Sequence, residues 1–547
     1  MSEQFDLVII GAGPGGYSTA LRAAELGMKV ALVERDATVG GTCLNRGCIP
    51  SKALITATHT IDTVHRAAEL GVNASVNGID FGTLRDYRLR VVKTMVGGLA
   101  GLLAHRGITV FRANATFHAD ETAPATSNHI VHLVPSPDQS DILTYHKADV
   151  PEPSGPTMDL TATNIVIATG AKPRPLPGNP FAGALIDSTQ ALEVNEFPSS
   201  AVIIGAGAIA LEFASMWNAA GSKVTLLIRK DRVLSAWDRR AGTTLTRELK
   251  RHGVNIITRA SVTHVDTGAN LGATVHYTRE GQDGEQSVWG EIALVAIGRD
   301  PITDPAWGVT IDDHGHVATD AYGRTDKPGV WAVGDVTAGH ALAHRAFEQG
   351  IVIAETIAGL NPKPVDEATV PQIVFSFPEA ASVGLTVEQA QAREDLIEIK
   401  ETNYPMLANA RMLMSGTAGS LTIVSGCDAR TPRACSACTW SPRWPPTSSP
   451  KPNSWSATMC RSPTQPASFT RIPRSVKRSA RRCSRPTDGR YTHAETNQHK
   501  QVRTSAPDKM WSSVFRPNKG RSDGGKGREA EEAEHNQADH PDLQVHG

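Results

Sequence analysis

Cysteine is scarce in the first three quarters of this 547-residue sequence. Of its seven cysteines, only Cys43 and Cys48 precede residue 427. A disulfide framework would distribute its cysteines through the well-patterned part of the chain. This usage therefore argues against a disulfide-stabilised secreted protein, and the two early cysteines need another explanation.

The sequence also lacks an excess of either charge and any long apolar run. It has 55 Lys and Arg against 56 Asp and Glu, for a formal net charge of -1. This balance gives no general affinity for nucleic acid or for an anionic membrane. The apolar runs are far shorter than the ~20 residues that cross a bilayer, and the N-terminus shows no secretion signal. We expect a soluble cytoplasmic protein whose partners include neither nucleic acid nor membrane.

What the sequence does contain is a strand–turn–helix–strand unit. An apolar run leads into a turn with Gly11, Gly13 and Gly16, and the next strand ends at Glu34. Gly11 allows a tight turn, Gly13 lets the backbone approach a pyrophosphate, and Gly16 permits close helix–strand packing. The helix N-terminus offers N–H groups to the phosphates, and Glu34 can accept hydrogen bonds from a ribose diol. The unit therefore predicts dinucleotide binding.

The same unit recurs over residues 200–230. Its turn consists of Gly205, Ala206, Gly207, Ala208, Ile209 and Ala210, so alanine replaces the third glycine. Two such units predict an α/β fold with two Rossmann-like dinucleotide-binding domains, each a parallel sheet covered by helices. The length leaves room for a third or fourth domain.

Cys43 and Cys48 lie in the segment "GGTCLNRGCIPSK", close behind the first glycine turn. They could be two buried small hydrophobic residues or a metal-binding pair, but no histidine or second cysteine pair lies nearby to complete a zinc site. A helix that begins near this segment would lower the pKa of a thiol. We favour a dithiol/disulfide couple next to a flavin.

The extended segment "GGTCLNRGCIPSKAL" resembles the redox-active segment of the flavin-dependent disulfide reductases. It is most similar to the dihydrolipoamide dehydrogenases, and less similar to glutathione and mercuric reductases. The resemblance runs from about residue 5 to about residue 425. It includes "ATG" at 168–170, "GVWAVGD" at 329–335, "ALAHRAFEQG" at 341–350 and "PEAASVGLT" at 378–386.

The resemblance implies an FAD-dependent oxidoreductase. It would pass electrons between a substrate dithiol or disulfide, the Cys43–Cys48 couple, FAD and NAD(P). The substrate would be a small molecule or a lipoyl domain, the family forms homodimers, and no metal is implied.

The resemblance also implies individual roles. Cys48 would lie against the flavin as the charge-transfer thiolate, and Cys43 would exchange with substrate. Lys52 would approach the flavin and pair with Glu212, and Asp335 would bind the ribityl chain. The remaining FAD contacts would come from Gly11, Gly13, Gly16, Glu34, Thr42, Ala115, Ala168, Thr169, Gly170 and Ala343. The coenzyme contacts would come from the second glycine turn (Gly205 to Ala210), Ile228, Arg229, Lys230, Val262 and Gly298.

The end of the strand after the second turn bears on the choice of coenzyme. NAD-dependent relatives carry an acidic residue there for the ribose diol, whereas this chain has Ile228 followed by Arg229 and Lys230. An aliphatic side chain cannot hold the diol, and two cations can pair with a 2′-phosphate. We predict NADP(H) rather than NAD(H), although a solvated basic turn is the alternative.

Composition, pattern and the resemblance together divide the chain into segments. The FAD-binding domain would span residues 1–170, with a polar, proline-rich surface insertion at 135–156, and would resume at 299–365. An NAD(P)-binding domain would occupy 171–298. Residues 366–426 would begin an α+β interface domain for dimerisation.

After Gly426 the apolar periodicity vanishes, and Ser, Arg, Pro and Thr dominate. Shifted one base earlier, the codons of Ala434–Pro442 permit V-L-G-V-H-M-V-S, which resembles the family's interface strand. Those of Phe469–Ser479 permit H-P-H-P-T-L-S-E-A-L, which contains the His-Pro-x-x-x-Glu motif that supplies the family's catalytic base. We predict that residues 427–547 are the disordered product of a reading-frame slip, with the base absent and the dimer lost or weak.

Two other functions fit the same sequence. The coenzyme turn favours an NADPH-dependent disulfide reductase of the glutathione reductase type. The altered C-terminal segment favours an impaired, flavin-binding remnant without disulfide turnover.

Overall fold

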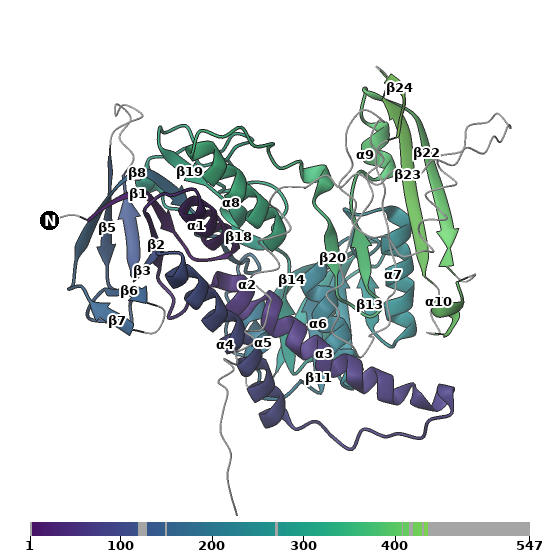
Figure 1. The fold of residues 1–547 in the computed structure, drawn as a ribbon. Coiled ribbons are helices and arrows are strands. Elements are labelled where there is room, and N and C mark those ends of the chain that lie inside the picture. Colours follow the sequence, from purple (N-terminus) through teal and green to yellow (C-terminus); the bar gives the residue numbers. More distant parts are fainter. Residues whose placement is uncertain are drawn as a thin grey trace, which may run out of the picture. The chain divides into compact units, whose positions relative to one another are not determined.

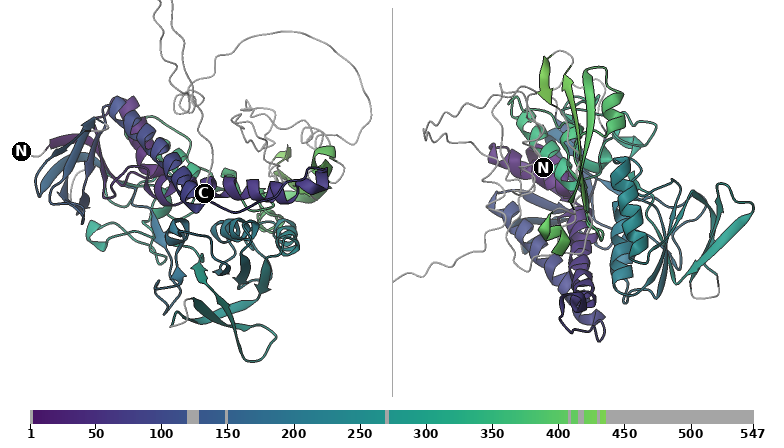
Figure 2. Two further views of the ribbon diagram at one scale, coloured as in Figure 1. Left: turned by 90° about the horizontal axis from the view of Figure 1, so that it is seen from below. Right: turned by 90° about the vertical axis from the view of Figure 1, so that its right-hand side faces the viewer.

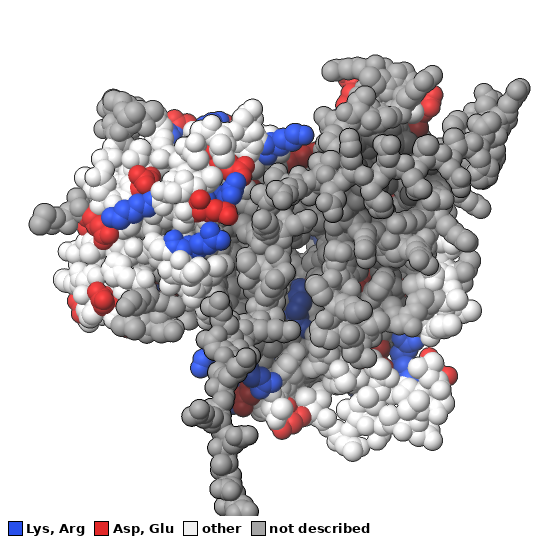
Figure 3. All heavy atoms as spheres, viewed as in Figure 1, with Lys and Arg blue, Asp and Glu red and all other residues white. Residues whose placement is uncertain are grey.

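The computed structural model describes residues 3–118, 128–147, 150–268, 272–406, 409–414, 419–428 and 431–435 (Figure 1). None of the helices in these ranges is both long and apolar enough to cross a membrane. On the face shown in Figure 3, acidic and basic side chains of the described residues are interspersed, in keeping with the near-zero net charge.

The first domain is built on a nine-stranded sheet in the order β4-β5-β8-β1-β2-β3-β6-β7, with β19 paired to β8. The strands are β1 (Glu3–Ile10), β2 (Val30–Glu34), β3 (Thr109–Arg112), β4 (Asn114–Phe117), β5 (His129–Val134), β6 (Leu143–Lys147), β7 (Val150–Pro153), β8 (Met158–Ile167) and β19 (Val330–Ala332). The helices are α1 (Pro14–Glu25), α2 (Gly41–Arg46), α3 (Cys48–His65), α4 (Phe81–His105) and α8 (Ala343–Ile357), with short 3-10 turns η1 (Ala67–Leu70) and η3 (Gly334–Val336).

The central strands of this sheet are parallel and buried on both faces. β1 pairs with β2 and β8, and β2 has five buried residues in succession. This explains the continuous apolar runs in the sequence, since a parallel strand covered on both faces needs no polar alternation. The chain returns to this sheet late, because β19 pairs in parallel with β8.

Helices from the two ends of this domain cross closely. A Cβ atom added to Gly350 of α8 would lie 2.3 Å from the hydroxyl oxygen of Ser18 on α1, so a side chain there would force the helices apart. Arg22 of α1 also pairs with Glu355 of α8 at 2.5 Å. These contacts hold α8 against α1 of the first domain.

The predicted surface insertion at 135–156 forms part of the sheet. β6 pairs antiparallel with β3, and β7 pairs with β6 at the edge. Ile142 is fully buried, and the hydroxyl of Ser136 donates to the carbonyl of Arg35 at 2.7 Å. Proline content obscured these strands in the sequence, but proline is tolerated in an edge strand, where one side needs no ladder hydrogen bond.

The second domain has a five-stranded parallel sheet in the order β10-β17-β11-β12-β13. Its strands are β10 (Leu185–Ile186), β11 (Ser200–Ile204), β12 (Lys223–Ile228), β13 (Asn255–Thr258) and β17 (Ile292–Val295), and its helices are α5 (Ser188–Glu193), α6 (Ala208–Ala219) and α7 (Arg239–Arg251). An antiparallel sheet of β14 (Ala260–Asp266), β15 (Ala273–Arg279) and β16 (Glu285–Gly290) projects beyond it in the right-hand view of Figure 2.

A two-stranded link connects the domains. β9 (Ala171–Pro173) leaves the first domain, β18 (Arg299–Pro301) returns to it, and the two pair antiparallel. The short 3-10 turn η2 (Pro305–Trp307) follows. The link therefore consists of residues 171–173 and 299–301.

The remaining described elements form a third region. They are the 3-10 turn η4 (Glu367–Thr369), β20 (Gln372–Val374), β21 (Ala380–Ser382), α9 (Val387–Gln391), β22 (Leu396–Pro405), α10 (Ala410–Met414), β23 (Ser420–Asp428) and β24 (Thr431–Cys435). β22, β23 and β24 make an antiparallel sheet. Described structure thus continues past Gly426, where the sequence suggested a boundary. The predicted disorder of the tail concerns residues that, from 436 onward, lie outside the described ranges.

Candidate active site

The first glycine turn is shaped by two close backbone approaches. Gly11 has a φ of 107°, and an added Cβ would lie 2.3 Å from the carbonyl oxygen of Ala168. A Cβ on Gly16 would lie 1.9 Å from the carbonyl oxygen of Gly11. Gly13 differs, because its nearest neighbour to an added Cβ is the Cα of Gly41 at 3.9 Å. The protein itself requires glycine at Gly11 and Gly16, whereas a Cβ at Gly13 would make only an ordinary van der Waals contact with the protein.

The helix that follows each glycine turn keeps its first N–H groups free of side-chain caps. α1 begins after Gly13 and α6 after Gly207, and neither has a capping side chain. By contrast, α4 and α7 are capped by Asp80 and Asp238. Uncapped N–H groups and the helix dipole suit an anionic phosphate. The residues present therefore fit the diphosphate of a dinucleotide at both turns.

Glu34 lies at the end of β2, as predicted, and is only 7% exposed. Its carboxylate accepts hydrogen bonds from the backbone N–H groups of Ala12 and Asp36, each at 2.9 Å. Burial raises the pKa of this carboxyl group, and the two hydrogen bonds oppose the shift. A carboxylate oxygen has more than one lone pair, so a ribose contact is compatible with these bonds.

The redox segment lies directly against the first glycine turn. The N–H of Gly40 donates to the carbonyl of Ala12 at 2.8 Å. A Cβ on Gly41 would lie 2.6 Å from the Cα of Gly13. Cys43 sits in the short helix α2, and Cys48 is the first residue of α3. The absence of a side chain at Gly41 is thus what allows this segment to approach the dinucleotide turn.

Cys43 and Cys48 are partly buried free thiols with opposite acid–base character. The thiol of Cys43 donates a hydrogen bond to Cys48, which lowers the pKa of Cys48 and raises that of Cys43. Burial opposes the lowered pKa of Cys48, while the positive charge of Lys52 and a backbone N–H at the start of α3 reinforce it. Cys48 is therefore the more acidic sulfur of the pair, and Cys43 the less acidic one.

The Lys52–Glu212 ion pair implied by the resemblance is present. The ammonium nitrogen of Lys52 lies 3.0 and 2.9 Å from the two carboxylate oxygens of Glu212. Glu212 also accepts the backbone N–H of Phe375 at 3.1 Å, and Lys52 lies 4.7 Å from the centre of the Phe375 ring. The ion pair therefore places a lysine from α3 and a buried glutamate from α6 next to each other, beside Phe375.

Asp335 follows β19 and has a half-buried carboxylate. Burial raises its pKa, and the positive charges of Arg299 and Arg345 oppose the shift. Among the described residues, no hydrogen bond donor reaches this carboxylate, so it is free to accept from the hydroxyls of a ribityl chain. Asp335 also acts on Cys43, because its negative charge raises the pKa of that thiol.

The other predicted FAD residues lie on several elements. Thr42 is in α2, Ala343 begins α8, and Ala168, Thr169 and Gly170 follow β8 at the first turn. The hydroxyl of Thr169 donates to the carbonyl of Ile302 at 2.6 Å. Ala115 lies on β4 and packs against the core of the first sheet.

Two residues near the cysteines were missed by the sequence analysis. Burial raises the pKa of the Tyr17 phenol, and electrostatic interactions with Cys43 and Cys48 add to the shift, which places Tyr17 close to the couple. Arg299 is buried enough to have a lowered pKa, and Asp335 and Cys48 oppose this shift. No pattern in the sequence marks either residue, because each reaches the site only through the folded arrangement.

The second glycine turn repeats the geometry of the first. Gly205 has a φ of 140°, and an added Cβ would lie 2.2 Å from the carbonyl oxygen of Ala296. An added Cβ on Gly207 meets nothing within 4 Å. Ala210 is fully buried, so a methyl group is accommodated where the first turn has Gly16.

The residues that bear on coenzyme choice lie at the end of β12. Ile228 is fully buried in the core and offers no group to a ribose. Arg229 and Lys230 are exposed, and within the described ranges neither side chain forms an ion pair or hydrogen bond. Val262 lies on β14, and Gly298, with a φ of 133°, lies between β17 and β18.

These features define a class of protein: a flavin- and nicotinamide-dependent oxidoreductase with a redox-active dithiol. Residues 5–350 match the family model of the pyridine nucleotide-disulphide oxidoreductases, and this chain belongs to that family. It is an oxidoreductase of the dihydrolipoyl dehydrogenase type that uses FAD and NAD(P).

Individual relatives agree with this placement. The chain is 35% identical over 424 residues to the dihydrolipoyl dehydrogenase of Geobacillus stearothermophilus, covering 77% of this chain and 83% of the relative. It is 36% identical over 426 residues to that of Bacillus subtilis, covering 77% and 84%.

Solved structures give the same fold. LpdA from Mycobacterium tuberculosis has a TM-score of 0.68 at 24% identity, covering 80% of this chain and 90% of its own. The Cu(II) complex of the HOCl-induced flavoprotein disulfide reductase RclA from Escherichia coli has a TM-score of 0.65 at 26% identity, covering 81% and 90%.

Proposed function

We propose that this chain exchanges electrons between a lipoyl-type dithiol or disulfide and NADP(H), through Cys43 and Cys48. The observation that carries the proposal is the adjacent thiol pair beside Lys52, in which the pKa of Cys48 is lowered and that of Cys43 is raised. A couple with this asymmetry has one sulfur suited to leave and one suited to exchange. The similarity to dihydrolipoyl dehydrogenases supports a dithiol substrate, either free or carried on a lipoyl domain.

The exchange chemistry follows from the positions of the two sulfurs. A substrate thiolate attacks the Cys43 sulfur of the oxidised couple, the Cys43–Cys48 bond breaks, and Cys48 leaves as a thiolate. Lys52 and the start of α3 stabilise that charge. The second substrate sulfur then attacks the first, releasing Cys43 and the substrate disulfide. Bound FAD supplies the two-electron exchange between this dithiol and the nicotinamide.

The proton that the substrate releases needs an acceptor. The groups that most shift the pKa values of Cys43 and Cys48 include no histidine. We propose that the base belongs to the His–Glu motif predicted in the alternative reading frame, which lies outside the described residues. In that case, disulfide turnover by the chain as translated is weak, and direct reduction of the flavin by coenzyme survives. An impaired enzyme is thus the second candidate function.

The residues at the end of β12 support the proposed preference for NADP(H) over NAD(H). Arg229 and Lys230 are exposed and free of carboxylate partners within the described ranges, and Ile228 offers no hydrogen-bond acceptor. Two unpaired cations suit a 2′-phosphate. The same observation favours the glutathione reductase type of activity as a further candidate, in which NADPH reduces a disulfide.

The test compares both directions with both coenzymes on the full chain. Flavin reduction is followed with NADPH and with NADH at equal concentration, and turnover with dihydrolipoamide or with oxidised disulfides. We expect NADPH to be preferred, and Arg229→Gln with Lys230→Gln to weaken NADPH but not NADH. A control variant, Lys223→Gln at the start of β12, leaves the ratio unchanged. Faster reduction of wild-type flavin by NADH than by NADPH contradicts the coenzyme assignment.

The domain limits and the dimer are also proposals. We propose FAD-binding segments at 1–170 and 299–365, an NAD(P)-binding domain at 171–298, and an interface region that starts at 366. Relatives of this type imply a homodimer. We propose that the chain as translated dimerises weakly, which analytical ultracentrifugation tests over a concentration series.

A further inference from the structure

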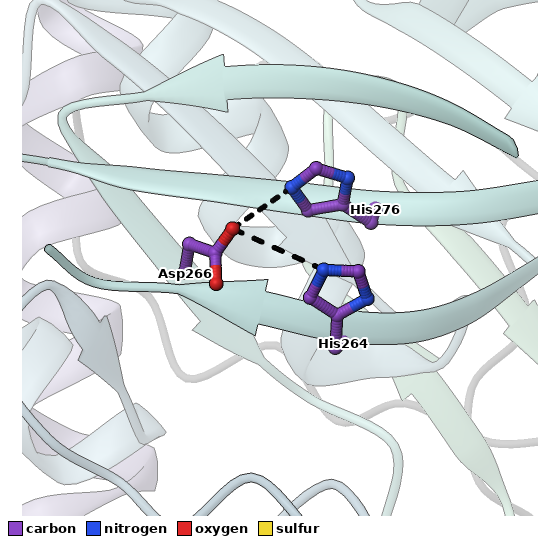
Figure 4. Close-up of side chains that lie close together, drawn as sticks. All are labelled: His264, Asp266 and His276. Carbon is purple, nitrogen blue, oxygen red and sulfur yellow. Dashed lines mark hydrogen bonds and ion pairs between the residues drawn. The ribbon is translucent and has the colours of Figure 1, made fainter.

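The solvent-facing side of the β14–β15–β16 sheet carries a compact cluster of imidazole and carboxylate groups. His264 on β14 is directly opposite His276 on β15, and Asp266 lies two residues along β14. Because side chains alternate across a strand, all three point to the same face of the sheet. Figure 4 shows both rings and the Asp266 carboxylate turned toward one another.

The two imidazoles converge on one carboxylate. Their rings are stacked, with centres 4.1 Å apart and planes within 7° of parallel. The Nε2 atom of His276 lies 3.1 Å from Oδ2 of Asp266, and that of His264 lies 3.9 Å from the same oxygen. Within the described ranges, this is the one group of at least three His, Cys, Asp or Glu residues whose potential metal-ligand atoms all lie within 4.8 Å of one another.

A second carboxylate occupies the other edge of both rings. Glu285, on β16, lies 3.8 Å from Nδ1 of His264 and 3.6 Å from Nδ1 of His276. The hydroxyl of Thr263 donates to Glu285 at 2.6 Å and helps to hold it in place. Each imidazole therefore has Asp266 at its Nε2 side and Glu285 at its Nδ1 side.

The cluster has no packing role that would account for it. The opposite face of the sheet is the apolar one, where Val275 and Tyr277 belong to the core. Asp266 is 64% exposed and His264 47% exposed, while His276 is 23% exposed. An exposed ion pair adds little stability, and two protonated rings in stacking contact would repel.

We propose that His264, His276 and Asp266 bind a divalent transition-metal ion such as Zn²⁺. Two imidazole nitrogens and a carboxylate oxygen are a donor set that suits Zn²⁺, Cu²⁺ or Ni²⁺, whereas Mg²⁺ and Ca²⁺ prefer oxygen ligands throughout. Glu285 lies 3.8 and 3.6 Å from the Nδ1 atoms of His264 and His276, on the side of the rings away from Asp266, so the Nε2 atoms are the ones placed to bind the metal. Solvent access leaves the remaining coordination position to water.

The test is Zn²⁺ titration of the full chain by calorimetry, with all thiols first alkylated by N-ethylmaleimide so that cysteines do not compete. The wild type should bind one more equivalent of Zn²⁺ than the His264→Gln/His276→Gln double variant. Glu285→Gln should keep this equivalent but bind it about 10–100-fold more weakly, because it removes only the outer-shell carboxylate. Flavin content and flavin reduction by coenzyme should be unchanged, which shows that the variants fold.

A matched control distinguishes the cluster from any surface histidine beside an acid. Nδ1 of His132 lies 2.6 Å from Oδ1 of Asp159 on an exposed part of the first sheet. Among the described residues, no second imidazole lies close enough to this pair to share a metal ion with it. His132→Gln should leave Zn²⁺ binding unchanged. Equal stoichiometry and affinity in the wild type and the double variant would overturn the proposal. An equal loss on His132→Gln would overturn it as well.

Discussion

The ammonium group of Lys52 and the carboxylate of Glu212 form an ion pair, 2.9 Å apart at the closest, that joins α3 of the first domain to α6 of the second. α3 begins with Cys48, so the pair lies one helical turn from the thiolate. Both charges act on that sulfur, and they act in opposite directions. Lys52 lowers the pKa of Cys48, and Glu212 raises it.

Removing either charge should therefore shift the titration of Cys48 in a predictable direction. Lys52→Met removes the stabilising cation, so we expect the pKa of Cys48 to rise by on the order of one unit. Glu212→Gln removes the opposing anion, so we expect it to fall. A pH titration of thiolate absorbance near the ultraviolet edge, on the reduced full chain, measures both. Lys29→Met, which removes a surface lysine paired with Glu3, is the control. Shifts of the same sign in both variants would contradict this account.

The two sulfurs should be separable by substitution. In Cys43→Ser, a hydroxyl still donates to Cys48, so we expect the long-wavelength absorbance of a thiolate against the flavin to persist at neutral pH. In Cys43→Ala the donor is lost, and the band should develop only at higher pH, by on the order of one unit. In Cys48→Ser the band should be absent. If it persists there, the assignment of the two sulfurs is reversed.

Two neighbouring glycines should respond differently to the same added methyl group. Gly16→Ala places a Cβ 1.9 Å from the carbonyl oxygen of Gly11, so we expect a loss of about 1–3 kcal/mol or more in the free energy of unfolding. Gly13→Ala meets only a 3.9 Å contact, so unfolding in denaturant should change little while the ratio of FAD to protein falls. Equal FAD content in Gly13→Ala and the wild type would argue against a phosphate at this turn.

The C-terminal segment is tested most directly at the level of nucleotides. Residues beyond 435 lie outside the described structure, so the reading-frame hypothesis rests on the codon argument alone. We expect codons 420–485, translated one base earlier from a point between about Gly426 and Ala434, to encode the interface strand and the His-Pro-x-x-x-Glu motif. Stop codons in that frame, or a different sequence at the motif, would end the hypothesis. Restoring the frame should raise disulfide turnover by about 10²–10⁴-fold, the usual contribution of a general base.

Much of the first dinucleotide turn was predictable because its requirements are local. Gly11 and Gly16 are needed where the backbone passes within contact of itself, and strand and helix follow at fixed spacings. The second glycine turn, the cysteine couple and the family resemblance were likewise recognised from short motifs with fixed spacings. The strands β6 and β7 were missed, because the pairing of β6 with β3 and of β7 with β6 at the sheet edge depends on neighbours that local composition does not reveal.

The sequence by itself determined the two strand–turn–helix–strand units and the place of Cys43 and Cys48 beside the first of them. Only the tertiary structure shows what lowers the pKa of Cys48, since that depends on Cys43, Lys52 and the start of α3 meeting at this sulfur. Glu212 lies 160 residues from Lys52, and His264 meets His276 only through the register of β14 and β15. Burial, strand register and domain contact set these relationships, and the spacing of residues along a chain does not contain them.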